Sequence, residues 1–157
     1  VKNGKLIEGV YEGETLNTPS MFCVADALDS LMWIKEIGGL TETIRRSNEN
    51  FKCLQGWVDK TPWIENLVSD PRNRSNTSVC LKFSDERLIS LIPDEKTRFV
   101  KEFVALLEAE NAAFDIKGHR NAPPGLRIWC GATINLDDIQ KLLPWLEYCF
   151  HEIISSY

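Results

Sequence analysis

The sequence lacks a long apolar run, and this absence excludes a first class of proteins. None of its apolar stretches approaches the roughly 20 residues that a helix needs to cross a bilayer. Residues 1–13 (VKNGKLIEGVYEG) have no apolar signal-peptide core. The chain also lacks an initiator methionine, and we therefore expect it to be a piece of a longer protein. These absences indicate a protein that has no membrane partner.

Basic charge is scarce as well. The 18 Lys and Arg residues are outnumbered by 23 Asp and Glu residues, so the formal net charge is −5. A protein whose main partner is a nucleic acid needs a basic face, and this composition argues against such a partner. The 157 residues, of which 43% are hydrophobic and 26% charged, have the composition of one ordinary globular domain.

The five cysteines lack the arrangements that metals and disulfides need. Their number is odd, and no two of them have the spacing of a metal-binding knuckle. Most lie in apolar stretches such as SVCLKF and RIWCGA. We interpret them as buried, reduced thiols of a cytoplasmic protein, and we predict no metal site. A catalytic cysteine stays open as an alternative, although no obvious histidine and acid arrangement accompanies one.

The apolar periodicity predicts an α+β fold with a small, mostly antiparallel sheet that helices cover on one side. Residues 1–16 have no clear period and are typical of a connecting or extended arm. The predicted helices cover residues 19–37, 41–60, 93–111 and 135 to near the C-terminus, and the predicted strands cover residues 63–68, 77–83, 112–116 and 125–130.

The first predicted helix has a clear start signal. Thr18 is a suitable N-cap, and Pro19 fits the first helical position. The apolar residues that follow lie on one side of the helix: Phe22, Ala25, Leu28 and Met32.

A basic loop stands out in this acidic chain. Lys117, His119, Arg120 and Arg127 surround the rigid turn Pro123-Pro124-Gly125. Arginine offers a planar fork that grips a carboxylate or phosphate with two hydrogen bonds, and a protonated histidine adds a donor. The loop therefore suits a small dianion or an amino-acid carboxylate. A solvated loop whose charges pair with nearby acids remains the alternative.

Two further polar clusters are weaker candidates. Asn17 and Thr18 precede a helix, where backbone N–H groups favour an anion, although the spacing favours a plain helix cap over an anion site. The segment RSNTSVCL, residues 74–81, favours a turn that enters a strand over a binding site.

Three segments together carry a resemblance to a known family. EGETLNTPSM (residues 12–21), RSNTSVCL (74–81) and KGHRNAPPGLRIWCGAT (117–133) resemble the C-terminal part of the phosphoserine aminotransferase family, and the similarity runs over about residues 4–154. The resemblance implies a homodimeric pyridoxal-phosphate enzyme with the aspartate aminotransferase fold. Such an enzyme moves an amino group between glutamate and 3-phosphohydroxypyruvate, and it yields phosphoserine and 2-oxoglutarate in serine biosynthesis.

The resemblance also implies roles for five residues. Asn17 and Thr18 match the pair that reaches across the dimer to the phosphate of the cofactor. His119 and Arg120 match the pair that crosses to hold the phosphate or distal carboxylate of the substrate. Arg127 matches the arginine that holds the substrate α-carboxylate.

One departure from the family limits what this chain is expected to do. No lysine here lies in the family's Schiff-base motif, and neither Lys2 nor Lys5 is assigned that role. We therefore assign no catalytic residue and expect the chain to be inactive alone. The resemblance implies that residues 1–20 are an arm from a missing large domain and that residues 21–157 are the C-terminal small domain with its long linking helix.

Two alternatives remain open. The chain could be a stand-alone, non-catalytic α+β module that binds an acidic metabolite or a partner protein. It could also belong to another aminotransferase of the same fold class with a different acceptor. The Gly118-His119-Arg120 segment argues for an acidic or phosphorylated substrate side chain, and so against alanine-type or glyoxylate-type substrates.

Overall fold

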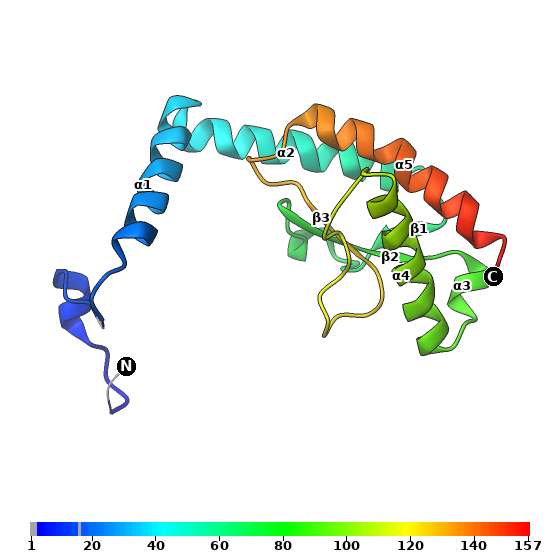
Figure 1. Cartoon of the computed structure of the whole chain (residues 1–157), viewed down its shortest axis with the longest axis horizontal. Coiled ribbons are helices and arrows are strands. Elements are labelled where there is room, and N and C mark those ends of the chain that lie inside the picture. Colours follow the sequence, from blue (N-terminus) through cyan, green and yellow to red (C-terminus); the bar gives the residue numbers. More distant parts are fainter. Residues whose placement is uncertain (1–2, 16) are drawn as a thin grey trace. The chain divides into compact units, whose positions relative to one another are not determined.

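The computed structural model describes residues 3–15 and 17–157 (Figure 1). Lys2, considered above, lies outside the described residues. The chain divides into two compact units, Val1–Leu40 and Thr41–Tyr157, which we describe separately. The boundary after Leu40 separates two units of this chain. The boundary predicted at residue 20 instead separates the arm of a large domain from the small domain, and it stays a prediction.

The described residues of the first unit form two helical elements of their own. The 3-10 helix η1 (Glu8–Glu12) lies in the segment expected to be an arm, and it ends at Gly13, whose φ of 96° suits a residue without a side chain. Helix α1 (Met21–Glu36) begins after Ser20, whose Oγ accepts a hydrogen bond from the backbone N–H of Cys23 at 3.4 Å. The predicted N-cap Thr18 is therefore wrong, because the hydroxyl of Ser20 provides the cap two residues later.

The apolar stripe of helix α1 is not buried. The structure buries none of its residues, and Met21 and Phe22 remain 77% and 79% exposed. Ala25, Leu28 and Met32 are exposed too. An apolar stripe predicts which side of a helix becomes buried only where a surface exists to cover it.

The second unit is built on a three-stranded antiparallel sheet. Strands β1 (Ile64–Asn66), β2 (Ser78–Phe83) and β3 (Leu126–Trp129) lie in the order β1-β2-β3, so β2 is central. Cys80 of β2 pairs with Arg127 of β3. Two short helical elements follow the first two strands, η2 (Pro71–Asn73) and α3 (Glu86–Ile89).

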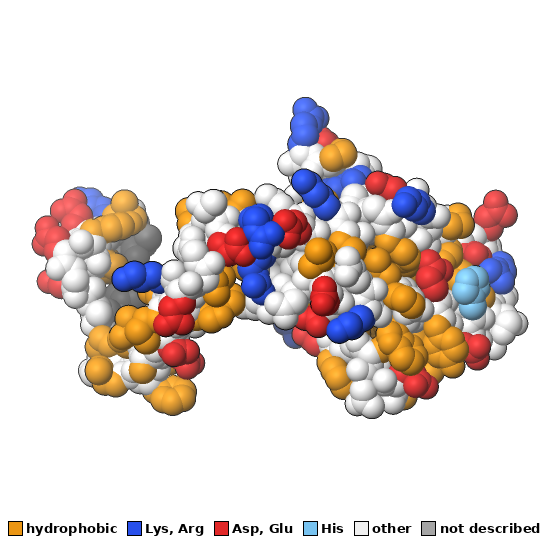
Figure 2. Space-filling view, turned by 90° about the horizontal axis from the view of Figure 1, so that it is seen from above, with side chains coloured by type: hydrophobic (Ala, Val, Ile, Leu, Met, Phe, Trp, Pro, Cys, Tyr) orange, Lys and Arg blue, Asp and Glu red, His pale blue; other side chains and the backbone are white. Residues whose placement is uncertain are grey.

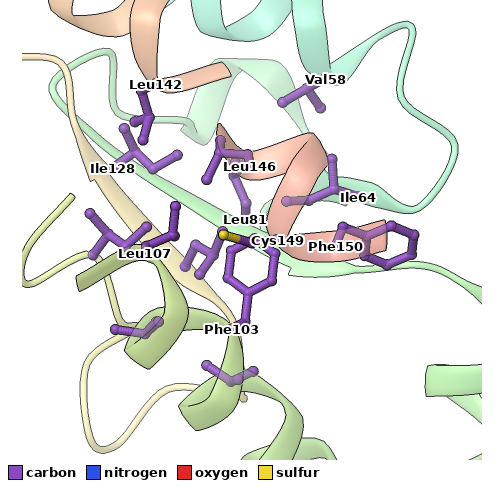
Figure 3. Close-up of a cluster of buried hydrophobic side chains, with 14 of the residues drawn as sticks. Val58, Ile64, Leu81, Phe103, Leu107, Ile128, Leu142, Leu146, Cys149 and Phe150 are labelled. Carbon is purple, nitrogen blue, oxygen red and sulfur yellow. The ribbon is translucent and has the colours of Figure 1, made fainter. Parts of the chain in front are cut away.

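Three helices bury one face of this sheet. They are α2 (Gly39–Val58), α4 (Pro93–Ala109) and α5 (Leu136–Ile154), and apolar side chains from all three meet the sheet (Figure 3). Alternate strand residues face this core, whereas their neighbours in sequence are more exposed. The predicted α+β fold is confirmed. The buried strand residues on β2 and β3 are Val79, Leu81, Leu126 and Ile128.

Tryptophan side chains tie α2, the start of β1 and α5 together. The ring of Trp63 stacks on that of Phe150, with centroids 4.1 Å apart. The carboxylate of Glu147 on α5 accepts hydrogen bonds from Nε1 of Trp57 at 2.7 Å and Nε1 of Trp63 at 3.1 Å. The carboxylate thus satisfies two indole donors at the edge of the core, as buried polar groups require.

One predicted strand is absent. Residues 112–116 form no strand, because Asn111 and Asp115 adopt left-handed backbone conformations with φ of 55° and 53°. Only a single bridge, between Lys117 and Leu126, extends the sheet on this side of β3. The predicted start of the last helix is correct, because Asn135 is the N-cap of α5.

None of the helices among residues 3–15 and 17–157 is long and apolar enough to cross a membrane. Acidic and basic side chains are interspersed with hydrophobic ones on the face drawn in Figure 2.

Candidate anion-binding site

The basic loop is closed at its base by backbone hydrogen bonds. The N–H of Gly118 donates to the carbonyl of Gly125 at 2.9 Å, and the N–H of Arg127 donates to that of Ile116 at 2.7 Å. Gly125 lies against the central strand, so a side chain there would collide with the carbonyl oxygen of Leu81. The glycine therefore allows the loop to pack closely on the sheet.

His119 is held with one ring nitrogen facing its own loop. Its Nδ1 accepts a hydrogen bond from the N–H of Asn121 at 3.2 Å, and its carbonyl accepts one from the N–H of Ala122 at 2.8 Å. Because Nδ1 is the acceptor, the neutral ring carries its proton on Nε2 and can donate from there. Arg120 is exposed, and its guanidinium has no hydrogen bond or ion pair to another described residue.

His119 and Arg120 line one pocket of the second unit. Its volume is ≈ 190 Å³. The basic loop forms most of the wall, and α4 contributes Thr97 and Val100. Lys117 adds a second cationic side chain beside Arg120. The pocket therefore presents cationic donors that can bind a phosphate or carboxylate group.

Arg127 lines a different pocket, on the sheet face that the helices leave open. Its side chain is 38% exposed, and its Nη2 lies 3.3 Å from Oδ2 of Asp115. The volume of this pocket is ≈ 370 Å³. Within this chain the three predicted substrate-binding residues thus line two pockets and not one. The Arg127 pocket is lined by Ser78, Phe114, Asp115, Ile116, Arg127 and Trp129.

Trp129 is a site residue that the sequence analysis missed. It lies two positions after Arg127 on β3, so both side chains point to the same face of the sheet. Its Nε1 donates to Oγ1 of Thr133 at 3.1 Å, and a side chain on Gly131 would collide with its indole ring. The alternation of the segment LRIW was the signal that could have identified it.

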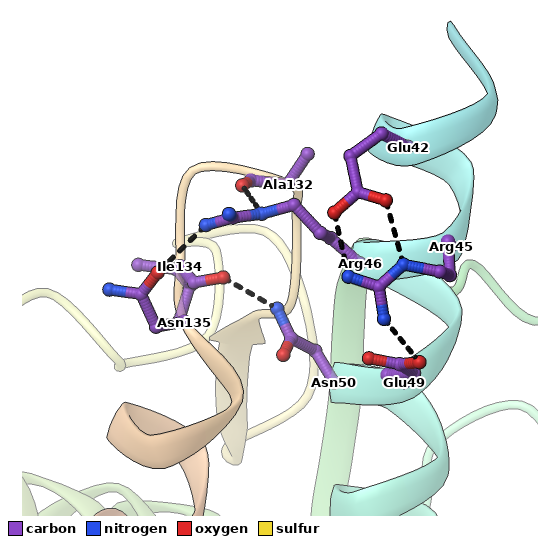
Figure 4. Close-up of polar contacts among 8 residues, drawn as sticks. All are labelled: Glu42, Arg45, Arg46, Glu49, Asn50, Ala132, Ile134 and Asn135. Carbon is purple, nitrogen blue, oxygen red and sulfur yellow. Dashed lines mark hydrogen bonds and ion pairs between the residues drawn. The ribbon is translucent and has the colours of Figure 1, made fainter. Parts of the chain in front are cut away.

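Helix α2 fixes the segment that follows β3 (Figure 4). Nδ2 of Asn50, which is 1% exposed, donates to the carbonyl of Ile134 at 2.9 Å. Nε of Arg46 donates to the carbonyl of Ala132 at 2.8 Å, and its Nη2 donates to Oδ1 of Asn135 at 2.8 Å. These bonds hold the end of the strand that carries Arg127 and Trp129.

The two residues predicted to bind the cofactor belong to the first unit. Asn17 and Thr18 are both exposed and lie just ahead of α1. Ser20 caps that helix, so a capping role does not account for either residue. Their amide and hydroxyl groups are donors of the kind that bind a phosphate beside a helix N-terminus.

The interpretation of residues 74–77 as a turn is confirmed. The guanidinium of Arg74 donates to the carbonyls of Val68 and Ser69, both at 2.8 Å. Nδ2 of Asn76 donates to Oδ1 of Asn48 on α2 at 2.8 Å. These side chains are committed to shaping the loop before β2.

The cysteines differ in their surroundings. All five are free, and Cys130 and Cys149 are buried as expected, but Cys23 is exposed. Burial raises the pKa of Cys130 to about 12, and chiefly burial raises the pKa of Cys149 to about 11. Both are thus protonated at neutral pH and poor nucleophiles. Among the described residues, no group of three His, Cys, Asp or Glu side chains is arranged to hold a metal ion.

Comparisons with known proteins identify relatives of the chain. No protein-family model matches the sequence. The phosphoserine aminotransferases of Methanosarcina mazei and Methanosarcina barkeri are each 42% identical to the chain, over 151 and 152 residues. These matches cover 95% and 96% of the chain. The chain is homologous to one part of phosphoserine aminotransferase. It spans 38% of the length of these two relatives.

Solved structures of phosphoserine aminotransferases have the same fold. The enzyme of Bacillus circulans subsp. alkalophilus matches 92% of the chain with a TM-score of 0.73 and 23% identity. A pyridoxal-phosphate-bound enzyme of Trichomonas vaginalis matches 88% with a TM-score of 0.71 and 22% identity. Each match covers 36% of the solved chain. The resemblance seen in three short motifs is confirmed, and it corresponds to a C-terminal part of phosphoserine aminotransferase.

Proposed function

We propose that this chain is the C-terminal domain of an enzyme that transfers an amino group between glutamate and 3-phosphohydroxypyruvate. The 42% identity over 95% of the chain supports the reaction. The observation that carries the proposal is the presence of two separate cationic pockets, one at Arg127 and one at His119 and Arg120. A substrate with two anionic ends needs one cationic group for each end, so each pocket contributes to the choice of substrate.

In this proposal each basic residue performs one task. Arg127 grips the α-carboxylate through its guanidinium fork and so fixes the orientation of the substrate Cα. His119, through Nε2, and Arg120 bind the phosphate or distal carboxylate. An uncharged substrate leaves this second pocket unsatisfied, and the enzyme discriminates against it for that reason. The resulting preference is for phosphoserine and glutamate over alanine.

Pyridoxal phosphate, when bound, supplies the electron sink that amino transfer needs. Asn17 and Thr18 have the donors to hold its phosphate ahead of α1. We propose that the protein is a cytoplasmic homodimer. In it these two residues, and the pair His119 and Arg120, serve the site of the neighbouring subunit, whereas Arg127 serves its own.

The test is an assay of the intact protein with pyridoxal phosphate, phosphoserine and 2-oxoglutarate. The expected products are glutamate and 3-phosphohydroxypyruvate, with much lower rates when alanine or glyoxylate replaces the acidic partner. Efficient alanine–glyoxylate transfer together with inactivity toward phosphoserine would contradict the proposal.

The alternative is a stand-alone module that binds an acidic metabolite or a partner protein, and it is favoured by two cationic pockets that residues of this chain line without a partner. The mass of the native protein separates the two. An immunoblot of source cells is expected to show a band at more than twice the 17.9 kDa of this chain. A band at 17.9 kDa would instead support the module.

A further inference from the structure

The charge of Arg127 already faces an acid of its own chain. Oδ2 of Asp115 lies 3.3 Å from Nη2 of Arg127, and this is the one ion pair of Arg127 with a described residue. The pair is exposed, since 90% of the Asp115 side chain is accessible to solvent. Only one donor of the guanidinium fork is engaged. A free carboxylate can engage two donors at once, so it can compete with Asp115 for the same group.

The backbone at Asp115 is held in an unfavourable conformation. Its φ of 53° lies in the left-handed region, which residues with a side chain rarely adopt, although Asp and Asn tolerate it better than most. This turn replaces the strand that the sequence predicts for residues 112–116. Conformations of this kind persist where the surroundings hold them, and they gather at binding sites.

The surroundings of the pair suit a small carboxylate. Phe114 and Trp129 line the same pocket, and their side chains are 65% and 52% exposed. Apolar walls displace water from part of the guanidinium, and ionic hydrogen bonds become stronger where water is excluded. The bond between Arg127 and Asp115 lacks this advantage, because the Asp115 carboxylate is exposed to water.

We propose that Asp115 is an internal competitor for the carboxylate site of Arg127. It occupies one donor of the guanidinium when the site is empty, and a substrate α-carboxylate displaces it. Asp115 is thus a positioning residue that lowers the affinity of Arg127 for carboxylates without touching the reacting atoms. The identity of the substrates, although not the competition itself, rests on the proposed function.

The decisive variant is Asp115→Asn. Asparagine keeps the size of the side chain and tolerates a positive φ, but it removes the negative charge. In the intact enzyme we expect the KM values for glutamate and for phosphoserine to fall by about two- to five-fold, as for the loss of an exposed ion pair. Both KM values fall by the same factor, because both substrates carry the same α-carboxylate and the second pocket is unchanged.

Glu152→Gln is the matched control. It changes the net charge equally, but residue 152 lies near the opposite end of α5 from Asn135, about 26 Å along the helix. We expect its KM values to equal those of the wild type. General damage to the site raises KM, so a fall in KM on removing a charge is not explained by a structural defect. Unchanged or raised KM values in Asp115→Asn would overturn the proposal.

A second measurement is independent of enzyme activity. The 157-residue chain is titrated with sodium acetate, and the NMR signal of the Arg127 Nε–H is followed, with Arg127→Lys to assign it. The expected midpoint is about two- to five-fold lower in Asp115→Asn than in the wild type and in Glu152→Gln. An equal or higher midpoint overturns the competition. If the intact protein transfers no amino group, the proposed function fails, and this titration alone decides the role of Asp115.

Discussion

The two units of the chain use similar apolar side chains with opposite results. In Thr41–Tyr157, Leu54, Phe103 and Leu107 are completely buried, whereas in Val1–Leu40 helix α1 buries none of its residues. The difference lies in the surface available to each helix. Helices α2, α4 and α5 pack on one sheet, whereas no surface buries the apolar side chains of α1. Apolar surface exposed in this way is expected to be covered in a larger assembly. The chain spans only 38% of its relatives.

The largest expected effect compares one phenylalanine from each unit. Phe103→Ala is expected to lower the free energy of unfolding of the 157-residue chain by about 3–5 kcal/mol, because it leaves a cavity in the core. Phe22→Ala on α1 is expected to change it by less than about 0.5 kcal/mol. Urea denaturation measures both. A large loss for Phe22→Ala would mean that α1 is packed in solution and that the contrast between the units is wrong.

The next effect separates the tasks proposed for the units. In the intact enzyme, Arg127→Ala is expected to lower kcat/KM for both substrates by about 10²- to 10³-fold, since two charged hydrogen bonds are lost. Its affinity for pyridoxal phosphate should stay unchanged. Thr18→Ala in the first unit is expected to weaken the binding of pyridoxal phosphate and to leave the binding of the substrate carboxylate unchanged.

Arg72→Ala is the control for the loss of an arginine, because Arg72 pairs only with Asp70 of its own turn among the described residues. Near-normal kinetics in Arg127→Ala would rule out the carboxylate role. If Arg127→Ala and Thr18→Ala lose cofactor affinity equally, substrate binding and cofactor binding are not separate tasks.

A smaller effect concerns the support of β3. Asn50→Ala removes the amide that bonds the carbonyl of Ile134 and, in the buried interior, the carbonyls of Cys130 and Gly131. We expect a loss of about 1–3 kcal/mol in unfolding free energy. Asn76→Ala, which removes an exposed bond to Asn48, is the control and is expected to cost less than about 1 kcal/mol. Equal losses in calorimetry or urea denaturation would assign no special role to Asn50.

The smallest effect is a difference in thiol chemistry between the units. Cys23 is exposed on α1, and we expect a thiol reagent at pH 8 to modify it well before Cys130 or Cys149. The raised pKa values of Cys130 and Cys149 also make the free energy of unfolding depend on pH. In the unfolded chain these thiols lose their protons from about pH 9, before they do so in the folded chain. Their contribution is therefore complete below pH 9 and declines as the pH rises toward 12.

Mass spectrometry of the labelled chain gives the order of modification. Cys130→Ala is expected to flatten the decline in stability above pH 9. Early modification of Cys130 under native conditions would contradict the closed core of the second unit.

The sequence predicted those elements whose patterns depend on local chemistry. The apolar periods of α2, α4 and α5 and the N-cap Asn135 could be recognised, because each signal lies within a few residues of its effect. The sequence could not show that residues 112–116 form no strand, because the left-handed conformation of Asp115 prevents it and has no signal in the local pattern. That residue faces Arg127 across the pocket, twelve positions away in sequence.

The candidate site was only partly predictable for a similar reason. Loop composition identified His119, Arg120 and Arg127, but a list of basic residues does not say that a rigid loop and a strand direct them into different pockets. Trp129 escaped notice because it was counted as an apolar strand residue, although its alternation with Ile128 placed it beside Arg127. Residues 17 and 18 have the donors for a phosphate, and their role stays a prediction.

The pairing of β2 with β3 has a consequence for the order of folding. It joins Ser78 to Trp129 and Leu81 to Leu126, and α4 lies between the two strands in sequence. A loop of about 50 residues must therefore close before the Arg127 pocket exists, and such closures delay the non-local parts of a fold. During synthesis on the ribosome, the pocket can form only after β3 has emerged. The face of the sheet that carries Arg127 thus forms later than structure that depends on local contacts alone.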